Sequence, residues 1–365
     1  MKIAVLDLVG EYNQLKDEIN HAVQRVLESG RFILSEDVVS FEKSLAQYTQ
    51  CRFAFGVASG TDALSVALMA LDIGPRDEVI TTPFTFFATP EVIALCGATP
   101  VFVDIDPRTF NIDPTRIEDA LTEHSKAIMP VDLYGQSCDM EPIMHIARTH
   151  GLKVIEDAAQ ALGAEHKDKK VCSLADIACL SFYPTKNLSC YGDGGALTTS
   201  DEELAKEIPP LRLHGARDKY HHEKLGRNSR LDAIQAAILS VKLKYLDTWN
   251  SRRIEIAARY DERLAECVTI PHRETYNKHA YHQYTIRAER RDELRQYLAE
   301  KGIPTTIYYP VPMHLQPALG YLRYKEDDLP EAEKAAKEVL SLPIYPQMSD
   351  DAVDYIAEAV REFYK

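Results

Sequence analysis

The sequence has no long hydrophobic run. Although 45% of its 365 residues are hydrophobic, no stretch approaches the roughly 20 apolar residues of a membrane-spanning helix. At the N-terminus the apolar run stops at Asp7, too early for a secretory signal peptide. These absences predict a cytoplasmic protein that does not enter a membrane.

Paired cysteines are also missing. The seven cysteines are scattered, odd in number and nowhere spaced as CxxC, which favours free thiols in a reducing compartment over a disulfide framework. The adjacent His221 and His222 have no third ligand near them in the sequence, so we expect no metal site.

Positive charge is scarce. The chain has 42 Lys and Arg residues against 56 Asp and Glu residues, a formal net charge of -14. Such a chain as a whole repels nucleic acids and anionic membranes, so an anionic ligand needs a local group of cations. Between Arg212 and Arg230, six Lys and Arg residues and two carboxylates give a local charge of +4. This segment could attract a nucleotide diphosphate and a carboxylate, or could be an ordinary solvated loop.

Short apolar segments alternate with helical patterns in the first part of the chain. Several are rich in Val, Ile and Phe without polar alternation, which is typical of strands covered on both faces by helices. The alternation predicts a doubly wound α/β fold with a seven-stranded, mostly parallel sheet. The predicted strands are 53–58, 78–82, 100–104, 127–131, 153–157, 178–183 and 195–199.

The pattern changes after about two thirds of the chain. Apolar residues at helical spacing predict one long helix over 232–246. A smaller α+β unit follows, with a strand at 281–288 and a helix at 291–301. We therefore predict a large domain over residues 1–245, including an N-terminal helix, and a small domain over 246–365.

A glycine opens a predicted helix directly after the first strand, in Ser59-Gly60-Thr61-Asp62. Glycine lets a ligand approach the backbone closely, and the first turn of a helix presents free N–H groups to an anion. The motif indicates a phosphate site, although Ser59 or Thr61 would also serve as a plain helix cap.

Asp157 ends a buried strand, in Lys153-Val154-Ile155-Glu156-Asp157. Open α/β sheets bind ligands at the carboxyl ends of their strands, and a carboxylate there can keep a heteroaromatic nitrogen protonated. Alternatively, Asp157 could cap the following helix.

Lys186 lies between a predicted strand and the glycine turn Gly192–Gly195. A lysine at such a place is usually solvated, but burial lowers the pKa of an amine and leaves it free to attack a carbonyl. The turn is no dinucleotide fingerprint, because Leu197 stands where the third glycine would be. A phosphate site, an acid at a strand end and a reactive lysine are together what pyridoxal 5'-phosphate requires.

With these motifs the chain resembles the DegT/DnrJ/EryC1/StrS family of sugar aminotransferases, which are fold type I enzymes dependent on pyridoxal phosphate. The resemblance covers nearly the whole chain. Its motifs are 59–64, 156–160, 181–186 and 192–195. It implies an enzyme that moves an amine, supplied by glutamate, to a keto group of a nucleotide-linked sugar.

The resemblance also assigns roles to residues by their place in these motifs. Lys186 and Asp157 would be catalytic, Lys186 by binding the cofactor covalently and Asp157 by pairing with the pyridinium nitrogen. The other cofactor-binding residues would be Gly60, Thr61 and Ser181 at the phosphate, Gln160 near the ring hydroxyl and Phe86 stacked on the ring. Phe86 could instead be a core aromatic, which suits Phe84 and Phe87 better.

The segment 226–232 is the next landmark of the family. The resemblance implies that Asn228 reaches the phosphate in the neighbouring subunit of a homodimer with shared sites. Arg230 would meet a sugar carboxylate across the dimer. Asn-Ser-Arg-Leu-Asp looks most like enzymes acting on UDP-2-acetamido-2-deoxy-3-oxo-glucuronate, which implies a role in cell-surface polysaccharide or lipopolysaccharide biosynthesis.

Tyr308, Tyr309 and His314 would flank the substrate, and with Ser35 they bear on which sugar is used. Three alternatives stay open at this point. One is the same reaction on a dTDP- or UDP-linked 3- or 4-keto-6-deoxyhexose, and another is a desulfuration, for which Cys190 is the only candidate. The third is a non-enzymatic protein that keeps the fold and senses a sugar; the intact lysine, acid and glutamine argue against it, because binding alone needs no reactive lysine.

Overall fold

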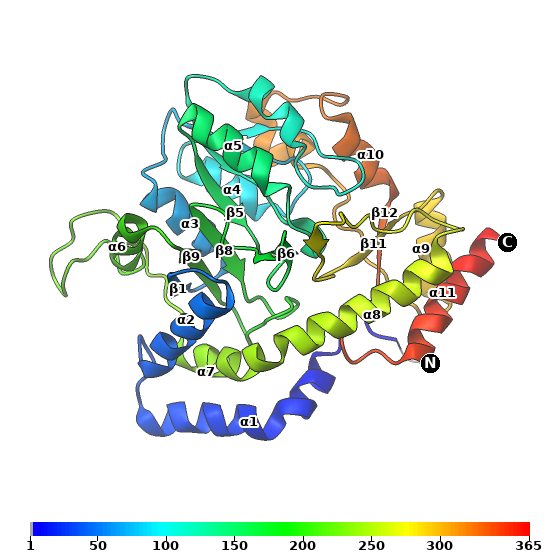
Figure 1. The fold of residues 1–365 in the computed structure, drawn as a ribbon, viewed down its shortest axis with the longest axis horizontal. Coiled ribbons are helices and arrows are strands. Elements are labelled where there is room, and N and C mark those ends of the chain that lie inside the picture. The colour runs from blue at the N-terminus through cyan, green and yellow to red at the C-terminus, as the bar shows by residue number, and fades with distance from the viewer. Residues whose placement is uncertain (1–2) are drawn as a thin grey trace.

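The computed structural model describes residues 3–365. Its centre is a seven-stranded sheet with helices on both faces (Figure 1). The strand order is β1-β9-β8-β5-β4-β2-β3, and β9 alone runs antiparallel to the other six. The strands are β1 (Phe53–Val57), β2 (Glu78–Thr81), β3 (Thr99–Phe102), β4 (Ser125–Met129), β5 (Lys153–Asp157), β8 (Ile177–Ser181) and β9 (Gly195–Thr199).

All seven predicted strands are confirmed, with ends displaced by at most two residues. Two successive residues of β5 show why the strand sequences lack an alternation of polar and apolar residues. Val154 packs into the apolar cluster beneath α5, whereas Ile155 packs into the cluster beneath α3 on the opposite face. A strand that is covered on both faces has no solvent side on which a polar residue would be favoured.

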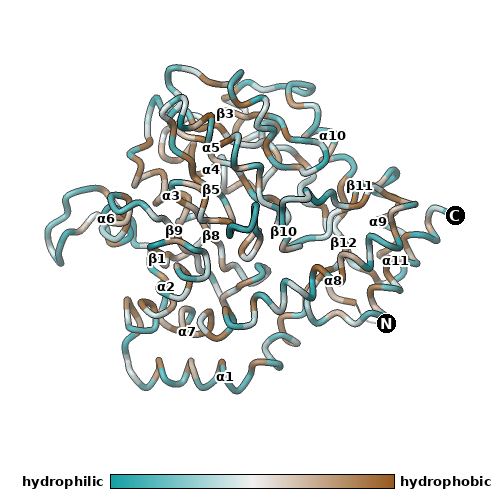
Figure 2. Tube along the Cα trace, viewed as in Figure 1, coloured by the Kyte–Doolittle hydropathy of each residue, from teal (hydrophilic) through white to brown (hydrophobic). Residues whose placement is uncertain are grey.

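Helices enclose this sheet and extend beyond it. The first six are α1 (Leu8–Ser29), α2 (Glu36–Tyr48), α3 (Gly60–Ala70), α4 (Ala88–Leu95), α5 (Met140–His150) and α6 (Glu202–Leu211). The later ones are α7 (Ala233–Lys242), α8 (Leu246–Leu264), α9 (Arg291–Glu300), α10 (Pro330–Glu338) and α11 (Asp350–Tyr364). Figure 2 shows hydrophobic residues gathered along the central strands, while the loop beyond α6 is mostly hydrophilic.

The single helix predicted over 232–246 is divided in two. A 3-10 turn at Leu243–Tyr245 separates α7 from α8, and Asp232 lies outside the helix at the N-cap position of α7. A tighter turn of this kind keeps the helical spacing of apolar residues nearly intact, so the sequence pattern does not reveal it. From this turn, α8 leads to the second unit of the fold (Figure 1).

The second unit has its own apolar core. Strands β11 (Tyr284–Arg287) and β12 (Val339–Leu342) pair antiparallel, and α8, α9 and α11 pack beside them. Short strands β6 (Glu165–His166), β7 (Lys169–Lys170) and β10 (Asn277–Lys278) form a third, small sheet. The domain division at 245/246 stays a prediction. Ile3 packs into the core of the second unit, although it lies near the start of the chain.

Within residues 3–365, no helix combines the length and the apolar character that crossing a membrane requires.

Candidate active site

A cavity of about 540 Å³ lies at the carboxyl ends of the parallel strands. Segments that follow β1, β2, β4, β5 and β8 contribute to its lining, because parallel strands end at one edge of a sheet. The second unit closes it with residues from two loops. Nine of the predicted site residues line it: Gly60, Thr61, Phe86, Asp157, Gln160, Ser181, Lys186, Tyr308 and Tyr309.

The N-terminus of α3 forms one wall of this cavity. The Ser59 hydroxyl caps the helix by accepting a hydrogen bond from the Asp62 amide at 3.1 Å. A Cβ atom at Gly60 would lie 2.6 Å from the Cβ of Ser181, so only glycine lets the helix approach the end of β8 this closely. The N–H groups of Gly60 and Thr61 have no partner within the helix and can bind an anion beside Ser181.

Asp157 places its carboxylate on the floor of the cavity. It is 5% exposed and accepts hydrogen bonds from the Thr89 hydroxyl at 2.9 Å and the Ala159 amide at 3.2 Å. Burial raises the pKa of Asp157, and the hydrogen bonds and the positive charge of Lys186 oppose that rise. A turn, not a helix, follows Asp157, so the alternative that it caps a helix is wrong.

Thr89 is a site residue that the sequence analysis missed. It lies in the first turn of α4, where its hydroxyl is 3.1 Å from that of Thr85 and donates to Asp157. Thr85 lies outside α4, so the spacing of the two threonines in the sequence does not reveal this contact.

Lys186 follows a turn in which its backbone amide donates to the Tyr183 carbonyl at 2.8 Å. Protein surrounds its side chain, although the cavity gives the amine some access. Burial lowers the pKa of Lys186 to about 8, and the nearby charge of Asp157 opposes the change. An amine with a pKa close to the working pH can act both as a nucleophile and as a base.

Asn187 fixes the segment that carries Lys186. Its amide donates to the Asn250 side chain at 2.8 Å and to the Ala280 carbonyl at 3.1 Å. Its oxygen lies 3.1 Å from Nδ1 of His282, which lines the cavity. Burial, together with the positive charges of Lys186 and Arg253, lowers the pKa of His282, so this imidazole is neutral.

Gln160 and two aromatic rings form the opposite side of the cavity. Gln160 accepts from the Tyr134 amide at 2.7 Å and donates to the Tyr309 hydroxyl at 3.1 Å. Phe86 is 59% exposed, and its ring centre lies 6.2 Å from that of Tyr309. Phe84 is fully buried. The core alternative is therefore correct for Phe84 and wrong for Phe86.

Three predicted residues do not line this cavity. Asn228 is exposed and Arg230 is half-buried, while Ser229 between them donates to Asp62 at 2.7 Å and ties their loop to α3. His314 is 2% exposed and lies 3.1 Å from the carboxylate of Glu333. That contact holds the buried His314 ring against α10, away from the position expected for a substrate-flanking residue.

The structure corrects the charge counted between Arg212 and Arg230. Four of the six cations are paired: Arg212 with Glu42, Arg217 with Glu223, Lys224 with Glu207 and Arg227 with Asp62. Three of those carboxylates come from outside the segment, so the local charge is largely compensated. Among the described residues, Lys219 and Arg230 have no carboxylate within 4.0 Å.

Two further carboxyl groups are buried behind Asp157. Glu156 accepts from the Cys172 amide at 2.8 Å, and Asp132 accepts from the Cys138 amide at 2.8 Å. The second oxygen of each has no other hydrogen-bond partner within residues 3–365. Burial and the neighbouring charge of Asp132 raise the pKa of Glu156, which favours the protonated form of this carboxyl group.

Glu156→Gln is expected to change how stability depends on pH. An unfolded glutamate has a pKa of about 4.3, and Glu156 has a higher one in the fold. Its contribution to stability is therefore complete below the unfolded pKa and is lost as the pH rises through the folded pKa. Glutamine carries no such proton. Between the unfolded and the folded pKa of Glu156, the free energy of unfolding of the variant should therefore rise relative to that of the parent by up to about 1.4 kcal/mol per pH unit.

Urea unfolding at about pH 5, 6.5 and 8 measures this difference. Glu123→Gln, at an exposed position, is the matched control and should follow the parent protein at each pH. Parallel profiles for Glu156→Gln and the parent would show that the pKa of Glu156 is not raised in the fold.

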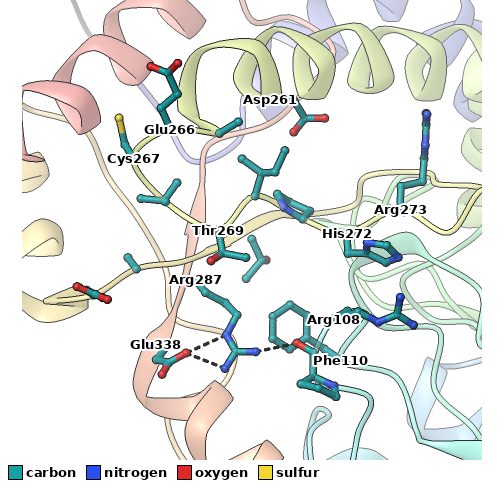
Figure 3. Close-up of a pocket in the computed structure, with 18 of the residues that line it drawn as sticks. Arg108, Phe110, Asp261, Glu266, Cys267, Thr269, His272, Arg273, Arg287 and Glu338 are labelled. Atoms are coloured by element: carbon teal, nitrogen blue, oxygen red, sulfur yellow. Dashed lines mark hydrogen bonds and ion pairs between the residues drawn. The ribbon is translucent and has the colours of Figure 1, made fainter.

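A larger hollow of about 1120 Å³ lies elsewhere, between α8, β11 and α10 (Figure 3). Its charges are mixed, and Arg287 is already paired with Glu338 at 2.7 Å and bonded to the Pro107 carbonyl at 2.7 Å. None of the predicted site residues lines it. Among residues 3–365, no group of three or more His, Cys, Asp or Glu side chains could hold a metal ion.

The 540 Å³ cavity fits pyridoxal 5'-phosphate. The first turn of α3 with Ser181 suits a phosphate, Asp157 suits a protonated ring nitrogen, and the amine of Lys186 suits an aldehyde. The steric requirement for glycine at position 60 supports the phosphate end, because a side chain there would fill the space between helix and strand.

Comparison with known proteins gives the same picture. The profile of the DegT/DnrJ/EryC1/StrS aminotransferase family matches residues 13–361. A pleiotropic regulatory protein of Geobacillus stearothermophilus is 52% identical, with 100% of this chain and 99% of that protein covered. A UDP-2-acetamido-2-deoxy-3-oxo-D-glucuronate aminotransferase of Pseudomonas aeruginosa is 45% identical, with 98% of this chain and 99% of that protein covered.

Solved structures match over almost the full length. The crystal structure of DesV from S. venezuelae in complex with a ketimine intermediate has a TM-score of 0.98 and 43% identity, covering 100% of this chain and 99% of that one. The crystal structure of NtdA from Bacillus subtilis with the bound cofactor PMP has a TM-score of 0.91 and 36% identity, covering 96% and 82%.

Proposed function

Since this chain belongs to the DegT/DnrJ/EryC1/StrS aminotransferase family, it is an aminotransferase of nucleotide-linked keto sugars, and we propose that Lys186 and Asp157 carry its reaction. The observation that supports this assignment most directly is their common cavity. A buried lysine with a lowered pKa and a buried carboxylate face the same space beside an anion-binding helix end.

The proposed cofactor residues follow from the geometry. The amides of Gly60 and Thr61 with Ser181 would bind the phosphate, Gln160 would lie at the ring hydroxyl and Phe86 would stack on the ring. When bound, pyridoxal 5'-phosphate supplies an electron sink for the charge that develops on the amino donor.

The two catalytic residues then have separate tasks. Asp157 keeps the ring nitrogen protonated, and Thr89 and the Ala159 amide hold its carboxylate in place. Lys186 would hold the aldehyde of the cofactor. Its amine, once free, would move the proton at the donor's α-carbon, first as base and then as acid.

We further propose a homodimer in which each subunit completes the other's site. Asn228 and Arg230 lie outside the cavity of their own chain. They lie at the base of the segment 212–230, where Asn228 bridges to Leu213 and Ser229 bonds to Asp62. The rest of this segment projects beside α6 (Figure 1). The loop also exposes apolar side chains, with Tyr220 76% and Leu225 90% exposed. Exposed apolar residues of this kind favour contact with another protein surface.

The proposed substrate is UDP-2-acetamido-2-deoxy-3-oxo-glucuronate, for cell-surface glycan biosynthesis. The 45% identical relative acts on this sugar, and Arg230 has no carboxylate partner among residues 3–365. A 3- or 4-keto-6-deoxyhexose has no carboxylate and would leave Arg230 unused. The desulfuration alternative is not supported, because burial raises the pKa of Cys190 to about 12.

Arg230→Ala is expected to test the sugar. In the parent enzyme, UDP-2-acetamido-2-deoxy-3-oxo-glucuronate should react faster than UDP- or dTDP-linked keto-6-deoxyhexoses. The variant should lose about 10-fold or more in kcat/KM for the sugar acid, since a charge-assisted hydrogen bond is removed, while its half-reaction with glutamate survives. Pre-steady-state absorbance of the cofactor separates the two halves, and equal loss in both would contradict a role for Arg230 at the sugar.

A further inference from the structure

Arg253 on α8 is a buried cation without an anionic partner. It is 4% exposed, and no carboxylate oxygen of residues 3–365 lies within 4.0 Å of its guanidinium group. One of its nitrogens, Nη1, donates to the Ile344 carbonyl at 2.8 Å and more weakly to the Tyr281 carbonyl at 3.5 Å. Its Nε is buried and has no hydrogen-bond partner in the described part of the chain.

An unpaired buried charge is costly to the fold. Burial lowers the pKa of Arg253 to about 10, so the side chain stays charged at neutral pH. Proteins seldom keep such a cation unless a counter-ion compensates for the lost hydration. Among residues 3–365, the more distant carboxylate of Glu11 acts on Arg253, but Glu11 is already paired with Lys242 at 2.6 Å. The guanidinium can therefore still bind an anion from outside.

A small cavity lies beside Arg253 and gives room for such an anion. Its volume is about 60 Å³, enough for a group the size of a carboxylate or about two water molecules. Thr306 and Ser341 add polar groups to its lining. It shares four lining residues with the 540 Å³ cavity that holds Lys186: Thr185, His282, Gln283 and Tyr308.

Two cations, Lys186 and Arg253, lie near this junction, and the carboxylates of Asp157 and Glu11 act on them. Lys186 and Arg253 both act on His282 from nearby and favour its neutral form. Gln283 adds a buried side-chain oxygen without a partner, and its amide can present either an oxygen or an NH₂ group. An anion that enters beside Lys186 therefore meets a cation and adaptable hydrogen-bonding groups.

We propose that Arg253 and the 60 Å³ cavity form the carboxylate subsite for the amino-acid donor. This inference rests on the proposed function, because the donor's amine must react where Lys186 lies. The carboxylate of an amino acid is within a few bonds of that amine, so it must bind close to Lys186. A sugar ring carrying a nucleotide is too large for 60 Å³ and requires the larger cavity.

The test uses the enzyme loaded with pyridoxal 5'-phosphate and two variants. Arg253→Gln removes the charge but can still donate to the Ile344 carbonyl, whereas Arg253→Lys keeps the charge. We expect Arg253→Gln to raise the glutamate concentration for half-maximal cofactor conversion by about 10-fold or more, with a smaller rise for Arg253→Lys. The affinity of Arg253→Gln for glutarate, a dicarboxylate without an amine, should fall by the same factor when it is measured by calorimetry.

The controls separate this subsite from a structural role. Arg252→Gln changes the adjacent arginine, which is already paired with Asp350 at 2.6 Å, and should leave glutamate conversion and glutarate binding unchanged. The keto-sugar half-reaction of Arg253→Gln should also match the parent enzyme. Equal loss in both half-reactions, or parent-like glutarate binding in Arg253→Gln, would overturn the proposal.

If Arg253→Gln does not fold, the Arg253→Lys variant tests the carboxylate subsite instead. Glutarate affinity between that of the parent and no binding supports the subsite, and parent-like affinity with parent-like glutamate conversion overturns it. A parent enzyme that glutamate does not convert at all would refute the proposed donor, which is a different result from an effect confined to the variants.

Discussion

Replacing Lys186 by alanine is expected to abolish transamination, with kcat reduced by at least about 10⁴-fold. Its amine is the only lysine amine in the 540 Å³ cavity, among the residues that the structure describes. Alanine can neither hold the cofactor covalently nor move a proton at the donor's α-carbon. Steady-state turnover and the absorption band of the lysine-bound cofactor should disappear together.

Two controls make this result specific to the Lys186 amine. Lys186→Arg keeps a positive charge near Asp157 but provides no nucleophilic amine, so it should be as inactive as alanine. Lys153→Ala removes an exposed lysine at the start of β5 and should retain the parent activity. Borohydride reduction followed by peptide mass analysis locates the covalent link, and a label on any residue other than Lys186 would refute the assignment.

Asp157→Asn is expected to lower turnover by about 10²–10³-fold, the usual effect of removing a preorganised charge from an active site. Asparagine has nearly the same shape and can still accept a hydrogen bond from the Thr89 hydroxyl. It cannot, however, stabilise a protonated ring nitrogen by charge. Cofactor binding should weaken less than kcat falls, and the two are measured separately by cofactor titration and by single-turnover kinetics.

Two further variants, Thr89→Val and Asp193→Asn, test whether the loss of turnover is specific to the Asp157 carboxylate. Thr89→Val leaves the Asp157 carboxylate in place but removes the hydroxyl that donates to it at 2.9 Å, so its loss should be smaller, about 10-fold. Asp193 lines the same cavity from an exposed position and should have less effect than Asp157. Parent-like turnover in Asp157→Asn would remove that carboxylate from the mechanism.

Much of the site could be predicted from local pattern. The unbroken apolar strands predict a parallel sheet, and parallel strands bring their carboxyl ends to one edge. For that reason Asp157, Ser181 and Gly60, each at the end of a strand or just after one, lie around one cavity. Lys186 joins them because only a short turn separates it from β8.

The charge between Arg212 and Arg230 shows the limit of that approach. Counting along the sequence gives +4, but Glu42 and Asp62 reach the segment from distant parts of the chain and pair with two of its arginines. His314 was expected at the substrate and instead bonds to Glu333. None of these three carboxylate partners can be recognised in a sequence pattern.

The amino-acid order alone determined the seven strands of the main sheet and most of the groups at its carboxyl edge, since unbroken apolar runs and short turns are local features of the sequence. Tertiary structure alone decided that Thr89 supports Asp157, that Asp132 is a neighbour of Glu156 and that Arg253 has no carboxylate within 4.0 Å among residues 3–365. Such contacts join residues far apart in the chain, and their geometry depends on how loops and layers pack, which no local period encodes.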